Sequence, residues 1–69
     1  MTVHLVRRRL PAGALSCVGP GDTIVLFGQG GDPGPLAGVR SERAAGPGAT
    51  LDDAALIALL FEAARVITW

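Results

Sequence analysis

The chain has 69 residues, of which 49% are hydrophobic and 17% charged, and its six arginines balance its six acids to a formal net charge of zero. A single cysteine excludes an internal disulfide, and the neutral overall charge gives no general attraction to nucleic acid or to an anionic membrane. A chain this short forms one domain, residues 1–69, and the high apolar content predicts that a second subunit covers part of its surface.

The first expected element is a strand over residues 3–6, an apolar run that is interrupted by His4. A lone histidine in such a strand is more often a hydrogen-bonded core or rim residue than a base or a metal ligand, and a zinc site needs several convergent ligands. We therefore expect neither a metal nor a cofactor. The start of the chain has no basic segment ahead of an apolar run, and no apolar stretch is long enough for a bilayer, so we expect a cytoplasmic protein without a signal peptide or membrane contact.

Three consecutive arginines, Arg7 to Arg9, follow this strand. They could contact RNA phosphate or an acidic subunit, but the sequence places no aromatic platform nearby, which favours a solvated edge or a subunit contact. Pro11 suits the first turn of a short helix over residues 12–18, which Gly19 is placed to end.

Cys17 lies in this short helix and is the one candidate nucleophile. A thiol becomes useful when nearby positive charge favours the thiolate, and Arg7 to Arg9 are a source of such charge. Cys17 sits toward the end of its helix, however, where the helix dipole opposes a thiolate. A small buried hydrophobic residue is the simpler interpretation, and persulfide chemistry at Cys17 is the alternative.

Residues 23–27 are β-branched and apolar without alternation, which is typical of a central strand of a parallel sheet. The glycine-rich residues 28–35 follow at the carboxyl end of that strand, where α/β sheets bind ligands and where N–H groups can hold an anion or a nucleotide. The segment matches neither the Walker nor the dinucleotide pattern, so a connecting loop is favoured. Beyond it we expect a weak strand over residues 36–39 and a helical turn over residues 40–45.

Thr50 is expected to begin the clearest helix by accepting a hydrogen bond from the N–H of Asp53. The apolar face of this helix is wider than one sheet face requires, so we expect part of it to meet a partner. Residues 66–68 predict a final strand beside residues 23–27, and Trp69 is expected to pack against the last helix or a neighbouring chain. The predicted partner interface consists of Leu56, Leu60, Phe61 and Trp69.

The alternation of these elements predicts an α/β fold: a small, mostly parallel sheet of three to four strands with flanking helices. Three segments, taken in order, also resemble the DsrH/TusB family, the small subunits of the DsrEFH and TusBCD sulfur-relay complexes. They are VHLV with His4, GDTIVLFGQGG with Asp22 and Gln29, and DDAALIALLFEAARVITW ending on Trp69. A weaker similarity lies in SERAAG, residues 41–46.

The resemblance implies a DsrE-like fold and a hetero-oligomer with DsrE/TusD-like and DsrF/TusC-like subunits. It also implies a role in passing persulfide sulfur, either toward 2-thiolation of the tRNA wobble uridine, with only an indirect link to tRNA, or within sulfur oxidation. In TusB-like members the working cysteine belongs to a partner, whereas DsrH-like members can carry one between the first two strands, the interval that holds Cys17. This chain is shorter than usual members, with an abbreviated first helix and almost no second helix.

Three functional hypotheses remain open. The first is a non-catalytic or sulfur-carrying subunit of a sulfurtransferase complex, with Cys17 as the carrier. The second is an α/β interaction domain that oligomerises through its apolar helix, with Cys17 inert. The third is an anion- or nucleotide-binding module that uses residues 28–31.

Overall fold

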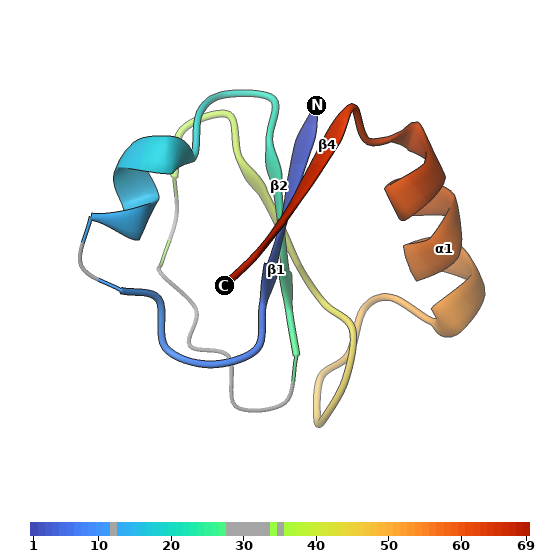
Figure 1. Cartoon of the computed structure of the whole chain (residues 1–69). Helices are drawn as coiled ribbons and strands as arrows, with labels where there is room; N and C mark the ends of the chain where they lie inside the picture. Colours follow the sequence, from blue (N-terminus) through green and yellow to red (C-terminus); the bar gives the residue numbers. More distant parts are fainter. Residues whose placement is uncertain (12, 28–33, 35) are drawn as a thin grey trace.

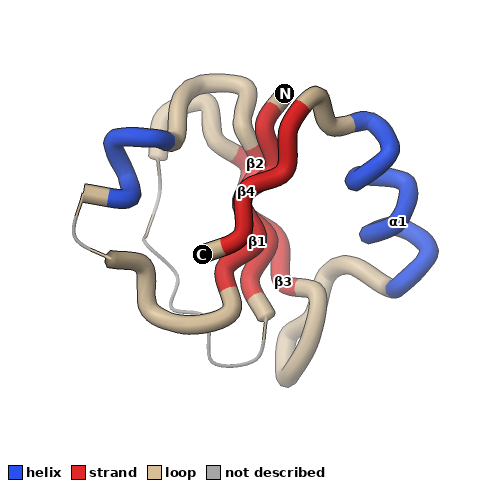
Figure 2. The backbone as a smooth tube through the Cα atoms, viewed as in Figure 1, coloured by secondary structure: helices blue, strands red, loops and turns tan. Residues whose placement is uncertain are grey.

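A computed structural model of the chain describes residues 1–11, 13–27, 34 and 36–69 (Figure 1). Within these residues, four parallel strands form one sheet and a single α-helix packs on it, so the fold is of the α/β type, as predicted. The elements are β1 (Thr2–Val6), the 3₁₀ turn η1 (Ala14–Cys17), β2 (Thr23–Leu26), β3 (Arg40–Arg43), α1 (Asp53–Glu62) and β4 (Arg65–Thr68). Figure 2 shows α1 and η1 on opposite sides of the sheet.

The strand order in the sheet is β3-β2-β1-β4. The two inner strands are the two apolar ones: all four residues of β2 are buried, and so are Val3, His4 and Val6 of β1. This placement follows from their composition, because an inner strand of a covered parallel sheet meets side chains on both faces. The expected strands at the start of the chain, over residues 23–27 and at the end of the chain are confirmed.

The final strand joins the sheet beside β1, so the prediction that it lies beside residues 23–27 is wrong. The reason is that a strand has two hydrogen-bonding edges, and β2 uses them for β1 and β3. In register, Val3 of β1 lies opposite Val66 of β4, and His4 lies opposite Ile67.

Each face of the sheet carries its own apolar cluster. On the α1 face, Val3 and Val25 pack with Leu51 and Leu59. On the η1 face, the buried members are Val6, Ile24 and Leu26, and the half-buried residues packed against them are Leu10, Val18, Leu36, Val39 and Trp69. Burying one such aliphatic side chain stabilises the fold by roughly 1.5–3 kcal/mol, so both faces contribute to stability.

The third strand is Arg40–Arg43, which corrects both predictions made for this region. Residues 36–39 form a turn instead of a strand, with the Val39 N–H bonded to the Leu36 carbonyl and Gly38 at φ 73°. Residues 40–43 extend along β2 instead of forming a helical turn. Their polar side chains hide the strand from a pattern search, but they are tolerated because β3 lies at the edge of the sheet.

Asp52, and not Thr50, caps the long helix. The Asp52 carboxylate accepts a 2.8 Å hydrogen bond from the N–H of Ala55, and α1 begins at Asp53. Thr50 is committed to β3 instead: its hydroxyl accepts from the N–H of Arg43 and donates to the Glu42 carboxylate. The helix predicted over residues 12–18 is shortened to the 3₁₀ turn η1, which follows Gly13 at φ 85°, and Ala12 lies outside the described residues.

Candidate functional site

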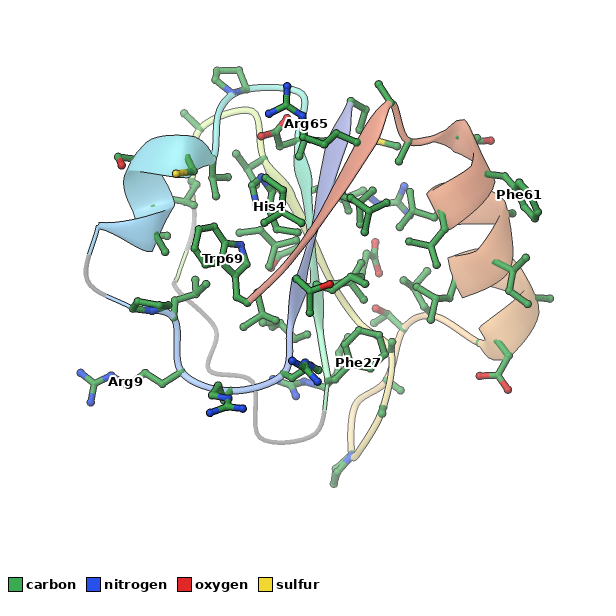
Figure 3. All side chains as sticks on the ribbon, in the orientation of Figure 1. His4, Arg9, Phe27, Phe61, Arg65 and Trp69 are labelled. Carbon is green, nitrogen blue, oxygen red and sulfur yellow. The ribbon has the colours of Figure 1, made fainter. Side chains whose placement is uncertain are left out.

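Among the described residues, the side chains of Asp22, His4 and Trp69 form one hydrogen-bonded chain. The His4 ring is fully buried in β1, with Nε2 3.1 Å from Asp22 Oδ2 and Nδ1 3.2 Å from Trp69 Nε1. The two rings lie nearly parallel, at 13°, with their centroids 6.2 Å apart. Figure 3 shows Trp69 reaching back toward His4 from the end of the last strand.

The indole N–H of Trp69 determines which nitrogen of His4 carries the proton. An indole nitrogen can only donate, so His4 Nδ1 must be the acceptor. The proton of the neutral ring is therefore assigned to Nε2, which donates to the Asp22 carboxylate. Both ring nitrogens are thus satisfied inside the protein, and His4 is the hydrogen-bonded core residue that the sequence predicts.

Asp22 ties together the amino ends of the two inner strands. Besides the bond from His4, its carboxylate accepts from the backbone N–H of Gly19 at 3.1 Å and of Thr2 at 3.3 Å. The Gly19 N–H and the His4 ring hold the pKa of Asp22 below its ordinary value, because both donors favour the carboxylate. This arrangement fixes the start of β2 against β1, which is a structural role.

The partners of His4 were not identified from the sequence. The sequence predicts a turn at Asp22 and a helix-packing or interface role for Trp69. Their contact with His4 is not visible in a local pattern, because 18 and 65 positions separate them from it. The one available signal was that all three residues occur in the segments that resemble the same family.

Cys17 is exposed, which overturns the expectation that it is a small buried hydrophobic residue. It ends η1, a turn in which only Ala14 is buried, and a single 3₁₀ turn cannot cover its own outer side. The thiol is therefore accessible to another protein. No hydrogen bond joins it to the other described residues, so nothing in the described structure places Cys17 in the His4 network.

Trp69 does not belong with the other residues predicted at the interface. Ile67 pairs with His4, and strand side chains alternate, so Trp69 two positions later returns to the His4 face. It packs on the η1 side of the sheet, which corrects the expectation that it packs against the last helix. Leu56 and Leu60 are half-buried against the core on the opposite side.

The outer surface of α1 is apolar and open. The Phe61 side chain is 87% exposed and Ile57 is 54% exposed, and together with Leu60 they line a small hollow. We call these three residues the outer face of α1, to which Leu60 contributes only the part of its side chain that is not packed against the core. In Figure 3, Phe61 points away from the sheet.

No family model, no curated protein and no solved structure matches this chain. The candidate site must therefore be interpreted from its own chemistry. Among the residues that the structure describes, no group of three or more His, Cys, Asp or Glu side chains is arranged to hold a metal ion. In the same part of the chain, no helix has the length and apolar character needed to cross a membrane. The proposed anion loop, residues 28–31, lies outside the described residues.

Proposed function

We propose that this chain is a subunit of a cytoplasmic sulfur-relay complex of the DsrH/TusB type, built on a DsrE-like fold. The observation that carries the proposal is the outer face of α1. The aromatic side chain of Phe61 is 87% exposed, and the aliphatic side chain of Ile57 beside it is also exposed. Exposure of neighbouring apolar side chains to water is unfavourable and is typical of a surface that another protein covers. The proposed occupants are DsrE/TusD-like and DsrF/TusC-like subunits.

The hydrogen-bonded chain of Asp22, His4 and Trp69 supports the family resemblance. Each of the three segments that resemble the DsrH/TusB family supplies one of these residues. Each segment alone is an unspecific similarity, but together their residues join β1, β2 and the end of β4. A shared purpose makes their joint occurrence more informative than three separate similarities.

Cys17 is the proposed point of sulfur transfer, if the chain carries sulfur itself. Its exposed thiolate would attack the outer sulfur of a partner's cysteine persulfide, forming a persulfide on Cys17 and releasing the partner's thiolate. The electron pair of the broken S–S bond leaves with the partner's sulfur, so no oxidant or reductant is needed. In the non-catalytic form of the proposal, the working cysteine belongs to a partner and this chain contributes only to assembly.

Assembly is tested by co-expression with DsrE-like and DsrF-like proteins from the same genome, followed by native mass spectrometry. We expect a hetero-oligomer that Phe61→Asp disrupts and that Leu15→Asp leaves intact. Leu15 is a suitable control because it is 42% exposed on η1, across the sheet from α1. Failure to form any hetero-oligomer would contradict the proposed role in a sulfur-relay complex.

The competing hypothesis, a self-associating interaction domain without sulfur chemistry, uses the same outer face of α1. It predicts a homodimer of the isolated chain that Phe61→Asp converts to monomer. Sulfur transfer is tested separately by incubation with a persulfide-loaded cysteine desulfurase and an assay for cyanide-labile sulfur. Label on the wild type but not on Cys17→Ser supports the carrier role, whereas an unlabelled chain within an intact complex supports the assembly role alone.

A further inference from the structure

We propose that the carboxyl edge of the sheet binds the phosphate backbone of single-stranded RNA through Arg7, Arg8 and Arg9, which we call the basic edge. This activity is separate from sulfur relay and from the outer face of α1. It rests on where the three arginines lie and on what surrounds them.

All three arginine side chains of the basic edge are exposed, directly after the inner strand β1. None of them forms a hydrogen bond or ion pair with another described residue. In Figure 3, Arg9 extends into solvent at the end of the sheet opposite to Arg65. Half of the arginines of a chain with zero net charge are therefore gathered at one end, which creates a local positive field that the total charge conceals.

The acidic side chains Glu42, in β3, and Asp22, just before β2, are already engaged by other donors. Arg40 donates a 2.8 Å hydrogen bond to Glu42, and Asp22 is held by His4 and by backbone N–H groups. Asp22 also lies at the amino end of β2, so it does not neutralise the basic edge at the carboxyl end. Among the described residues, no acidic side chain pairs with the basic edge, so its charge is available for an external anion.

Phosphate is the anion that suits this group. Guanidinium groups bind phosphate oxygens through paired N–H donors and stay charged at every physiological pH. The carboxyl ends of parallel strands are also the usual place for ligands in open α/β sheets. Phe27 follows β2 at this same edge, and its backbone N–H donates to the carbonyl of Val6, next to Arg7. Its half-buried ring packs against the apolar cluster on the α1 face. The part of the ring that stays exposed lies at the same edge of the sheet as the arginines, and exposed aromatic surface together with positive charge is the combination that binds single strands.

A nucleic acid fits the basic edge better than an acidic protein does. Stable protein interfaces need an apolar centre, and the large exposed hydrophobic side chains of the described residues lie elsewhere. They are Met1, Leu15, Ile57, Phe61 and Val66. Phosphate binding needs no such centre, because its free energy comes largely from released counterions.

The test is fluorescence anisotropy with a labelled oligouridine RNA at several salt concentrations. Three phosphate contacts predict a slope of about −2 for log K against log salt, and binding roughly 20-fold weaker at about 200 mM than at about 50 mM salt. Replacing all three arginines of the basic edge by glutamine should abolish the salt-dependent binding. Arg65→Gln is the control for position, because it removes a single exposed positive charge at the other end of the sheet and should leave RNA binding almost unchanged.

Three results would overturn the proposal: no binding to the RNA at about 50 mM salt, equal binding by the triple glutamine variant, or binding to polyglutamate but not to RNA. The last result would assign the basic edge to an acidic protein. Because the three side chains are exposed and unpaired among the described residues, the triple variant should unfold at the wild-type temperature, which separates lost binding from lost folding. It should also still form the hetero-oligomer, while Phe61→Asp should still bind RNA.

Discussion

Trp69 donates a 3.2 Å hydrogen bond from its indole nitrogen to Nδ1 of His4, across 65 positions of the sequence. This one contact ties the end of the last strand to the first strand, and it holds the buried histidine in the tautomer that serves Asp22. The stability of the whole sheet should therefore be sensitive to a single nitrogen on Trp69.

Trp69→Phe should destabilise the protein by about 1–3 kcal/mol, because it keeps an aromatic ring but leaves a buried nitrogen of His4 without its donor. Urea unfolding followed by circular dichroism measures this loss of stability, because the substitution removes the tryptophan fluorescence that would otherwise report unfolding. Thr68→Val on the same strand is the control, and its effect should stay within about 0.5 kcal/mol. A Trp69→Phe variant as stable as the wild type would show that the hydrogen bond contributes nothing.

Acid should unfold the protein partly through Asp22. The pKa of Asp22 is lowered in the folded state by the Gly19 N–H and by His4, so its stabilising contribution is complete above the unfolded pKa. That contribution is lost as the pH falls below about 4 and passes through the folded pKa. The pKa of Glu42 is lowered by Thr50 and Arg40, and it adds a second contribution of the same sign.

The variant Asp22→Asn distinguishes the contribution of Asp22 to acid unfolding from that of Glu42. At neutral pH, the free energy of unfolding in urea should be lower for Asp22→Asn than for the wild type. Between neutral pH and pH 2, it should fall by less in Asp22→Asn than in the wild type. Glu42→Gln should likewise remove only the part of the pH dependence that Glu42 contributes. An Asp22→Asn variant with an unchanged pH profile would mean that Asp22 has the same pKa in both states.

Truncation of a side chain on the inner side of α1 should destabilise the protein far more than truncation on the outer side. Leu59 is only 7% exposed and packs on Val3 and Val25, so Leu59→Ala should cost about 2–5 kcal/mol. Phe61→Ala should change the unfolding free energy of the monomer by no more than about 0.5 kcal/mol, because that ring is almost fully exposed. Equal losses for the two variants at high dilution would show that Phe61 is covered within the monomer.

The cap of α1 gives a local test of where the helix begins. Asp52→Ala should cost about 1 kcal/mol, because the N–H of Ala55 loses its acceptor. Asp53→Ala is the control: that residue is exposed and makes only the weaker, salt-screened contribution of a charge near the helix dipole. The prediction fails if Thr50→Ala frays the first turn, measured by amide exchange at Ala55, while Asp52→Ala does not.

Local pattern was a good guide wherever one segment contains its own signal. The β-branched and apolar run at residues 23–27 predicted a buried inner strand, and the lone His4 among apolar neighbours predicted a hydrogen-bonded core or rim residue. It was a poor guide at β3, because the strand Arg40–Arg43 has polar side chains that only an edge position allows. It also failed at the helix start, where Thr50 and Asp52 are both good caps and only the contact of Thr50 with Glu42 and Arg43 decides between them.

The amino-acid sequence by itself determined the small α/β fold, the inner strands and the apolar helix, because hydrophobic patterns act over a few neighbouring residues. The tertiary structure alone decided the strand order, the face on which Trp69 lies and the exposure of Cys17. It also alone revealed that Asp22, His4 and Trp69 form one hydrogen-bonded chain. The physical reason is that such contacts join residues far apart along the chain, and they exist only once parallel strands from different segments have paired in register.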